Sequence, residues 1–377
     1  MRRVGLVAVA LLLLAILAFE LSKSWPAGRL AAGNLEDYGG ALASAQALDM
    51  GLNPFAHYAT LPAAPGLVGN TPNIDLPLSL LLFHPLSLVP PILGFWLMVA
   101  ASAAGYLAAL AALRLLYPSI FTPLRLLWAL TFTPFWIAVT FNQIYVALLL
   151  VALFGLDQVR RGNDIPAALA IGLLVALKPN LAVWPALLFL AGHRRLGVTA
   201  LAGAALVSLL PAAFFGPGIY GQWYAAVAGA GDQVRLAANV SLWGFFGRLG
   251  ATWIGQGLSA ALLAALALWA WCTRPSPQNI YPVAVAAALL ANAVAWAGYL
   301  VLLLPWFLGR RWTPVVRIVA VACVAPFPSL GWIYTAALLA IAGETLAHRR
   351  TTGSEQRGPR LLMVQHSPPP QVLGGGD

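Results

Sequence analysis

Ionisable residues capable of chemistry are concentrated in one stretch of an otherwise apolar chain. Five of them lie between positions 36 and 75, namely Glu36, Asp37, Asp49, His57 and Asp75. A carboxylate in a partly dehydrated site has a raised pKa and can take a proton from an attacking hydroxyl. These carboxylates form no tight pair with a histidine at metal-ligand spacing, so the sequence predicts neither a metal site nor another cofactor.

The element expected to carry the first of these residues is a helix. Apolar residues recur at helical spacing from Asp37 to Asn53, which predicts an amphipathic helix at the membrane interface. A lone aspartate at the start of a helix more often stabilises the helix dipole than performs catalysis. On the residues alone, both roles of Asp37 stay open.

Lys178 is a second candidate because its surroundings are apolar. It lies in the sequence Lys178-Pro179-Asn180, between two short apolar segments bounded by Arg160-Arg161 and His193-Arg194-Arg195. An ionisable group within a membrane costs about 2.5 to 3.5 kcal/mol on insertion scales, which favours a functional role if the lysine is buried. A lysine at a helix end can instead extend its amine to the membrane surface. The short segments predict two passes with Lys178 at the turn between them.

The composition requires a bilayer around these elements. Of the 377 residues, 61% are hydrophobic and only 8% are charged, far from the average of soluble proteins. The apolar runs lack the alternation of barrel strands, so the sequence predicts an all-α polytopic integral membrane protein with about 10–12 transmembrane helices. The clearest runs are Val4–Phe19, Leu93–Leu116, Ile144–Leu156, Leu196–Phe215, Leu258–Trp271 and Gly331–Ala347.

The formal net charge of +10 comes largely from short basic clusters between the apolar runs, such as Arg160-Arg161 and Arg310-Arg311. This pattern is typical of cytoplasmic ends that contact anionic membrane lipids, and no basic face with interleaved aromatics suggests nucleic-acid binding. It predicts one transmembrane domain over residues 1–348, with two large extracytoplasmic loops at about 21–75 and 216–255. Residues 349–377 are expected to form a disordered cytoplasmic tail. The segment Ile74–Ile92 contains four prolines and is expected to be re-entrant or an outer-leaflet helix pair.

Several short motifs occur in an order that resembles a known family. They are Asp37-Tyr38, Gly51-Leu52-Asn53-Pro54-Phe55, Leu76-Pro77 to Phe83-His84-Pro85-Leu86, Asn142-Gln143, Lys178-Pro179, and Asn239-Val240-Ser241-Leu242 with Arg248. This order resembles glycosyltransferase family 87 of the GT-C superfamily, over a region from Asp37 to about Pro305. The resemblance implies an enzyme of the bacterial plasma membrane. Such an enzyme moves a sugar, a hexose such as mannose or a pentose, from a polyprenyl phosphate carrier to a lipid or glycan acceptor on the outer face.

The resemblance also implies roles for individual residues. Asp37 would be the general base of a single, inverting displacement, and Lys178 and Arg248 would bind the donor phosphate. Contacts to the sugar or the acceptor would come from Glu36, Tyr38, His57, Gln143, Asn239, Ser241 and Tyr299.

The chain departs from the family pattern at one place. Family members often carry a histidine near an outward helix end, where this chain has Gly298 in the sequence Asn292 to Tyr299. Asn292, Tyr299 or His57 would then replace it, or the substrate differs. The departure leaves open an inactive membrane assembly subunit, and a lipid or glycan transporter is the other alternative.

Overall fold

A computed structural model describes residues 2–23, 27–69, 73–325 and 330–347, and the tail predicted at 349–377 lies outside them. The described part of the chain is helical, with isolated β-bridges and no strand. Its helices are α1 (Arg2–Lys23), α2 (Ala27–Ala31), α3 (Glu36–Asp49), α4 (Leu78–Ser87), α5 (Pro91–Leu116), α6 (Pro123–Leu130), α7 (Thr133–Thr140), α8 (Tyr145–Arg161), α9 (Asp164–Leu177), η1 (Pro179–Ala182), α10 (Val183–Leu190), α11 (Arg194–Phe215), α12 (Gly218–Gly229), η2 (Gly231–Arg235), α13 (Leu242–Arg248), α14 (Thr252–Thr273), α15 (Pro277–Leu290), η3 (Ala297–Leu303), α16 (Leu304–Leu308), α17 (Pro314–Ala322) and α18 (Gly331–Ala347).

The apolar runs of the sequence coincide with helices α1, α5, α8, α11, α14 and α18. Within the described residues, four helical segments, which include α1, α5, α11 and α14, are long and apolar enough to cross a membrane, and five shorter apolar helices accompany them. The predicted helical class is therefore confirmed, and the chain has the character of a membrane protein. The number of passes and the two extracytoplasmic loops stay predictions.

The centre of the bundle is formed by α15 and η3, which are buried along almost their whole length. Helices α8, α10 and α18 pack around them. Small residues allow neighbouring helices to approach closely: a Cβ atom added at Gly172 of α9 would lie 2.7 Å from the Ala200 carbonyl oxygen of α11. The core is thus a tightly packed scaffold, which holds the turns at its end in fixed positions.

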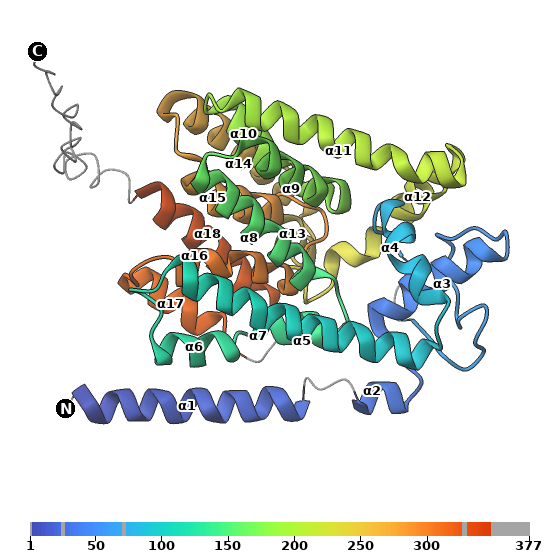
Figure 1. Ribbon diagram of the computed structural model, residues 1–377, viewed down its shortest axis with the longest axis horizontal. Coiled ribbons are helices and arrows are strands. Elements are labelled where there is room, and N and C mark those ends of the chain that lie inside the picture. The colour runs from blue at the N-terminus through green and yellow to red at the C-terminus, as the bar shows by residue number, and fades with distance from the viewer. Residues whose placement is uncertain (1, 24–26, 70–72, 326–329, 348–377) are drawn as a thin grey trace, which may run out of the picture.

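Helices α3, α4 and α12 gather at one end of the bundle, and α1 lies along its edge (Figure 1). The prediction of an amphipathic interfacial helix for Asp37–Asn53 is wrong, because α3 is buried on nearly all sides. Its small residues explain this: a Cβ atom added at Gly39 would lie 2.7 Å from the Cα atom of Gly69 in the following loop. Helix α4 has 10 residues and a length of about 15 Å, too short to cross a bilayer.

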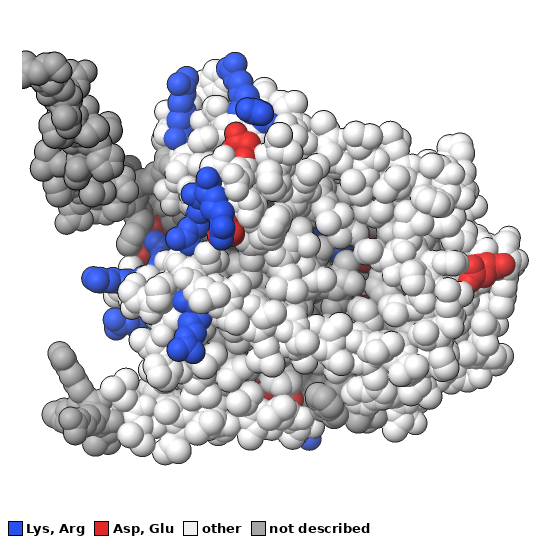
Figure 2. Space-filling model, in the orientation of Figure 1, with Lys and Arg blue, Asp and Glu red and all other residues white. Residues whose placement is uncertain are grey.

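The basic clusters lie at the other end of the molecule. Arg160 and Arg161 close α8, and Arg194 opens α11. On the face shown in Figure 2, Lys and Arg side chains gather at the end opposite to α3 and α4. The separation of charge expected from the sequence is therefore present along the long axis of the bundle.

Candidate active site

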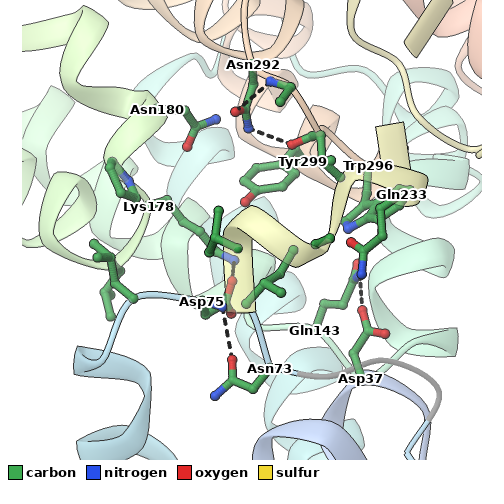
Figure 3. Close-up of a pocket in the computed structure, with 18 of the residues that line it drawn as sticks. Asp37, Asn73, Asp75, Gln143, Lys178, Asn180, Gln233, Asn292, Trp296 and Tyr299 are labelled. Atoms are coloured by element: carbon green, nitrogen blue, oxygen red, sulfur yellow. Dashed lines mark hydrogen bonds and ion pairs between the residues drawn. The ribbon is translucent and has the colours of Figure 1, made fainter. Parts of the chain in front are cut away.

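A cavity of about 650 Å³ opens at the end of the bundle that holds α3, α4 and α12. Six parts of the chain line it: the start of α3, the segment before α4 together with Phe83 of α4, the turn between α7 and α8, the turn between α9 and α10, the region of α12 to α13, and residues 292–299. Figure 3 shows its polar side chains, which include Asp37, Asp75, Gln143, Lys178 and Tyr299. Segments more than 250 residues apart in the sequence thus contribute to one site.

Asp37 is held at the cavity wall by two hydrogen bonds. Its backbone N–H donates to the carbonyl oxygen of Phe141 at 3.2 Å. The side-chain Nε2 of Gln143 donates to Asp37 Oδ2 at 2.5 Å (Figure 3). The carboxylate is half-buried, so part of it faces the cavity. Gln143 therefore orients the carboxylate, which stays partly open to the cavity.

The surroundings of Asp37 adjust its acidity. Burial raises the pKa of Asp37 to about 6, although the hydrogen bond from Gln143 opposes this. The negative charges of Asp75 and Glu36 add to the rise, and the positive charge of Lys178 reduces it. A carboxyl group with a pKa near 6 is mostly ionised at neutral pH and is a stronger base than an ordinary aspartate. Asp37 can therefore take a proton from a hydroxyl group in the cavity.

Lys178 lies in the turn between α9 and η1, as the two short apolar segments predicted. It is only 7% exposed, and its Nζ is paired with Asp75 Oδ1. The amine also lies 5.5 Å and 5.4 Å from the ring centroids of Tyr145 and Tyr299. It is therefore an ammonium group at the cavity wall and does not extend into bulk water.

Asp75 is the residue that sequence reasoning did not assign. It belongs to the acidic stretch, but its partner Lys178 is 103 residues away in the sequence. The side chain of Asn73 accepts a hydrogen bond from the Asp75 backbone N–H at 3.0 Å, which fixes the local turn. The sequence signal was the pair Asn73 and Asp75 immediately before the proline-rich segment.

Four of the ten predicted site residues line the cavity together: Asp37, Gln143, Lys178 and Tyr299. Glu36 does not, because its side chain is 0% exposed and paired with Arg29 at 2.5 Å. The ring of Tyr38 is buried near Phe83 and Phe95. His57 is exposed on a loop and is not part of the cavity wall.

The remaining predicted residues brace the region around α13. The Asn239 side chain donates to the carbonyl oxygens of Val234 and Ala293, both at 2.9 Å. The Ser241 hydroxyl accepts the Gly244 N–H at 2.9 Å and so caps the start of α13.

Arg248 lies on the same helix, outside the cavity wall. Its Nη1 donates to the carbonyl oxygens of Leu236 and Asn239, both at 3.0 Å. These contacts hold the chain that follows η2, whose residues Gln233 and Val234 line the cavity. A direct contact of Arg248 with a donor phosphate stays a prediction.

Gly298, where the resemblance to the family predicts a histidine, lies against Gln143, the hydrogen-bond partner of Asp37. A Cβ atom added there would lie 2.9 Å from Gln143 Oε1 and 2.9 Å from the ring of Tyr145. A larger side chain would therefore displace Gln143 from its present place. Asn292 and Tyr299 line the cavity, and a contact of either with a substrate in place of that histidine stays a prediction.

Among the described residues, no group of three or more His, Cys, Asp or Glu side chains could hold a metal ion. The expectation of catalysis without a metal stays a prediction that an activity assay must test.

A sequence model of glycosyltransferase family 87 matches residues 77–281, more than half of the chain. No curated protein matches the chain. The matched region includes Gln143, Lys178 and Arg248, whereas Asp37 and Asp75 precede it. The structure brings these two carboxylates into the same cavity as the matched residues.

Proposed function

Because this chain belongs to glycosyltransferase family 87, we propose that it transfers a sugar from a polyprenyl phosphate carrier to a lipid or glycan acceptor. The observation that carries the proposal is one cavity with a basic carboxylate, Asp37, and a buried ammonium group, Lys178. A base for the acceptor and a cation for the leaving phosphate are what this reaction requires.

In the proposed reaction, an oxygen lone pair of the acceptor hydroxyl attacks the anomeric carbon of the donor sugar. The bond from that carbon to the phosphate oxygen breaks, and the electron pair leaves with the polyprenyl phosphate. Asp37 takes the hydroxyl proton, and Gln143 holds the carboxylate in the orientation for this transfer. A single displacement gives a product with inverted anomeric configuration.

Lys178 is proposed to stabilise the negative charge on the departing phosphate. Its ammonium is already oriented by Asp75 and by the faces of two tyrosine rings. A fixed cation needs little reorganisation when charge develops, which is the main source of electrostatic catalysis. Asp75 would then share the ammonium with the phosphate or give way to it.

The charge distribution supports an orientation in the membrane. Basic clusters at the end opposite to the cavity would face the cytoplasm and its anionic lipids (Figure 2). The cavity would then open on the outer face of the bacterial plasma membrane, where a carrier-linked sugar is the available donor.

A reconstituted transfer assay tests the proposal. Purified protein in liposomes receives a radiolabelled polyprenyl phosphate sugar and a mixed bacterial lipid extract, and labelled product is separated and its anomeric configuration determined by NMR. We expect an inverted product with wild-type protein. Movement of the intact donor across the bilayer without transfer would indicate a transporter. If several donor sugars are tested and the protein neither transfers nor transports any of them, the result would indicate an assembly subunit.

A further inference from the structure

Two residues next to the site have a backbone conformation that is uncommon for side chains other than glycine. Glu36, immediately before Asp37, has φ of 54°, and Asn142, immediately before Gln143, also has φ of 54°. Left-handed backbone at a non-glycine residue costs free energy, so the surrounding contacts must enforce it. Both turns direct the following side chain into the cavity.

The turn at Asn142 is the end of α7. The Gln143 N–H donates to the Ala138 carbonyl at 2.8 Å, and the Asn142 N–H donates to the Val139 carbonyl at 3.1 Å. This is the Schellman arrangement, in which the left-handed position is usually glycine and sometimes asparagine. The Asn142 side chain also donates to the Phe95 carbonyl of α5 at 3.1 Å, which fixes the turn to a second helix.

The turn at Glu36 begins α3. The Glu36 N–H donates a hydrogen bond to Asn34 Oδ1 at 2.8 Å, and the buried Glu36 carboxylate accepts one from Arg29 Nη1 at 2.5 Å. The Arg29 guanidinium lies 5.0 Å from the ring centroid of Phe141, the residue whose carbonyl accepts the Asp37 N–H. The two turns that precede Asp37 and Gln143 are thus linked to each other through Arg29 and Phe141.

We infer that Glu36 and Asn142 are positioning residues that hold Asp37 and Gln143 together, with Arg29 securing Glu36. The inference rests on the proposed function of Asp37 as the base. The sequence predicted that Glu36 contacts the sugar or the acceptor. Because no part of its side chain is exposed, we infer an indirect role instead.

The Glu36 carboxylate also acts through its charge. The charged groups that influence Asp37 include Glu36, Asp75 and Lys178, and the Tyr145 hydroxyl is a further titratable group nearby. Arg29 is the charged partner of Glu36. Among them, Glu36 and Asp75 raise the pKa of Asp37. Removal of the Glu36 charge therefore lowers the pKa of Asp37, and the ionised fraction of the base persists to lower pH.

The test compares variants by the pH dependence of kcat and kcat/KM. With Glu36→Gln we expect the acidic limb to move to lower pH and kcat to fall about tenfold with KM little changed, because orientation is lost and donor contacts remain. Asp157→Asn, which breaks the ion pair with Arg161 on α8, removes the same charge far from the cavity and should leave the profile unchanged. If the acidic limb of the pH profile in Glu36→Gln stays where it is in the wild-type protein, the proposed effect of the Glu36 charge is refuted.

Asn142 provides a second test that does not depend on the ion pair. Glycine accepts the left-handed turn and alanine does not, so Asn142→Gly should lower kcat by about threefold or less and Asn142→Ala by about tenfold or more. Equal kcat in the two variants would refute the positioning role of the turn. Asp37→Asn is measured in parallel: if it keeps wild-type turnover, the proposed function fails, whereas an inactive Asp37→Asn with unaffected Glu36→Gln and Asn142→Ala refutes only this inference.

Discussion

The titration of Asp37 gives the most quantitative test of the proposed chemistry. Its pKa is raised to about 6 by burial, and its hydrogen-bond partner Gln143 cannot itself take up a proton at ordinary pH. The base must be ionised to act, so activity is low below this pKa and rises with pH. The test therefore varies the pH of the wild-type protein and compares its transfer rate with that of the Asp37→Asn variant.

The magnitude follows from the ionised fraction. With a pKa of about 6, roughly nine tenths of the carboxyl groups are ionised at pH 7 and roughly one tenth at pH 5. We expect kcat/KM to fall about tenfold between these values through this group alone. Asp37→Asn removes the base and should lower kcat by about 10² to 10⁴-fold. An amide has nearly the shape of the carboxylate, so donor binding should change little.

The measurement is the initial rate of sugar transfer in liposomes from pH 4.5 to 8.5, with donor binding determined separately by retention of labelled carrier. Thermal unfolding at each pH serves as the control that the protein remains folded. An Asp37→Asn protein with wild-type turnover would remove Asp37 as the base. A wild-type profile that is flat between pH 5 and 7 would contradict the raised pKa even if the variant is inactive.

Three further predictions concern the rest of the cavity. Lys178→Gln should weaken donor binding and reduce the transfer rate severely. Lys178→Arg should restore the rate only in part, because an ammonium and a planar guanidinium place their hydrogen-bond donors differently. Near-normal rates in both variants would show that Lys178 has no role in the reaction. Transfer should survive EDTA, and a loss restored by Mg²⁺ or Mn²⁺ would show that carboxylates such as Asp75 hold an ion. Gly298→Ala should lower kcat about tenfold, since its Cβ would meet Gln143 Oε1 at 2.9 Å, and unchanged kinetics would show that Gln143 tolerates displacement.

The helical framework was predictable because apolar runs of bilayer length admit few structures. The turn at Lys178 was predictable for the same reason, since two basic clusters about thirty residues apart leave room for two short helices. The burial of α3 was not, because its glycine, alanine and serine residues resemble a polar or neutral surface in sequence. In the structure these small side chains allow close backbone contact, as at Gly39.

The site was only partly predictable. Motif order indicated Asp37, Gln143 and Lys178, and the structure places all three on one cavity wall. Polar side chains that bind backbone carbonyls, such as Asn239 and Arg248, look the same in sequence as side chains that bind a ligand. Burial and hydrogen-bond partners separate these two cases, and both depend on contacts between distant parts of the chain.

At the cavity wall, the Lys178 ammonium is already paired with the Asp75 carboxylate. A buried lysine without a partner would tend to lose its proton, whereas a carboxylate alongside keeps it charged. Asp75 therefore maintains the cation that the proposed donor phosphate would need, and a bound phosphate would make the same kind of ionic contact with Lys178. A phosphate bound in the cavity would add negative potential at Asp37, on top of that from Asp75 and Glu36. On the proposed function, the pKa of Asp37 should then rise further in the complex, and the carboxylate should be a stronger proton acceptor with the donor bound than without it.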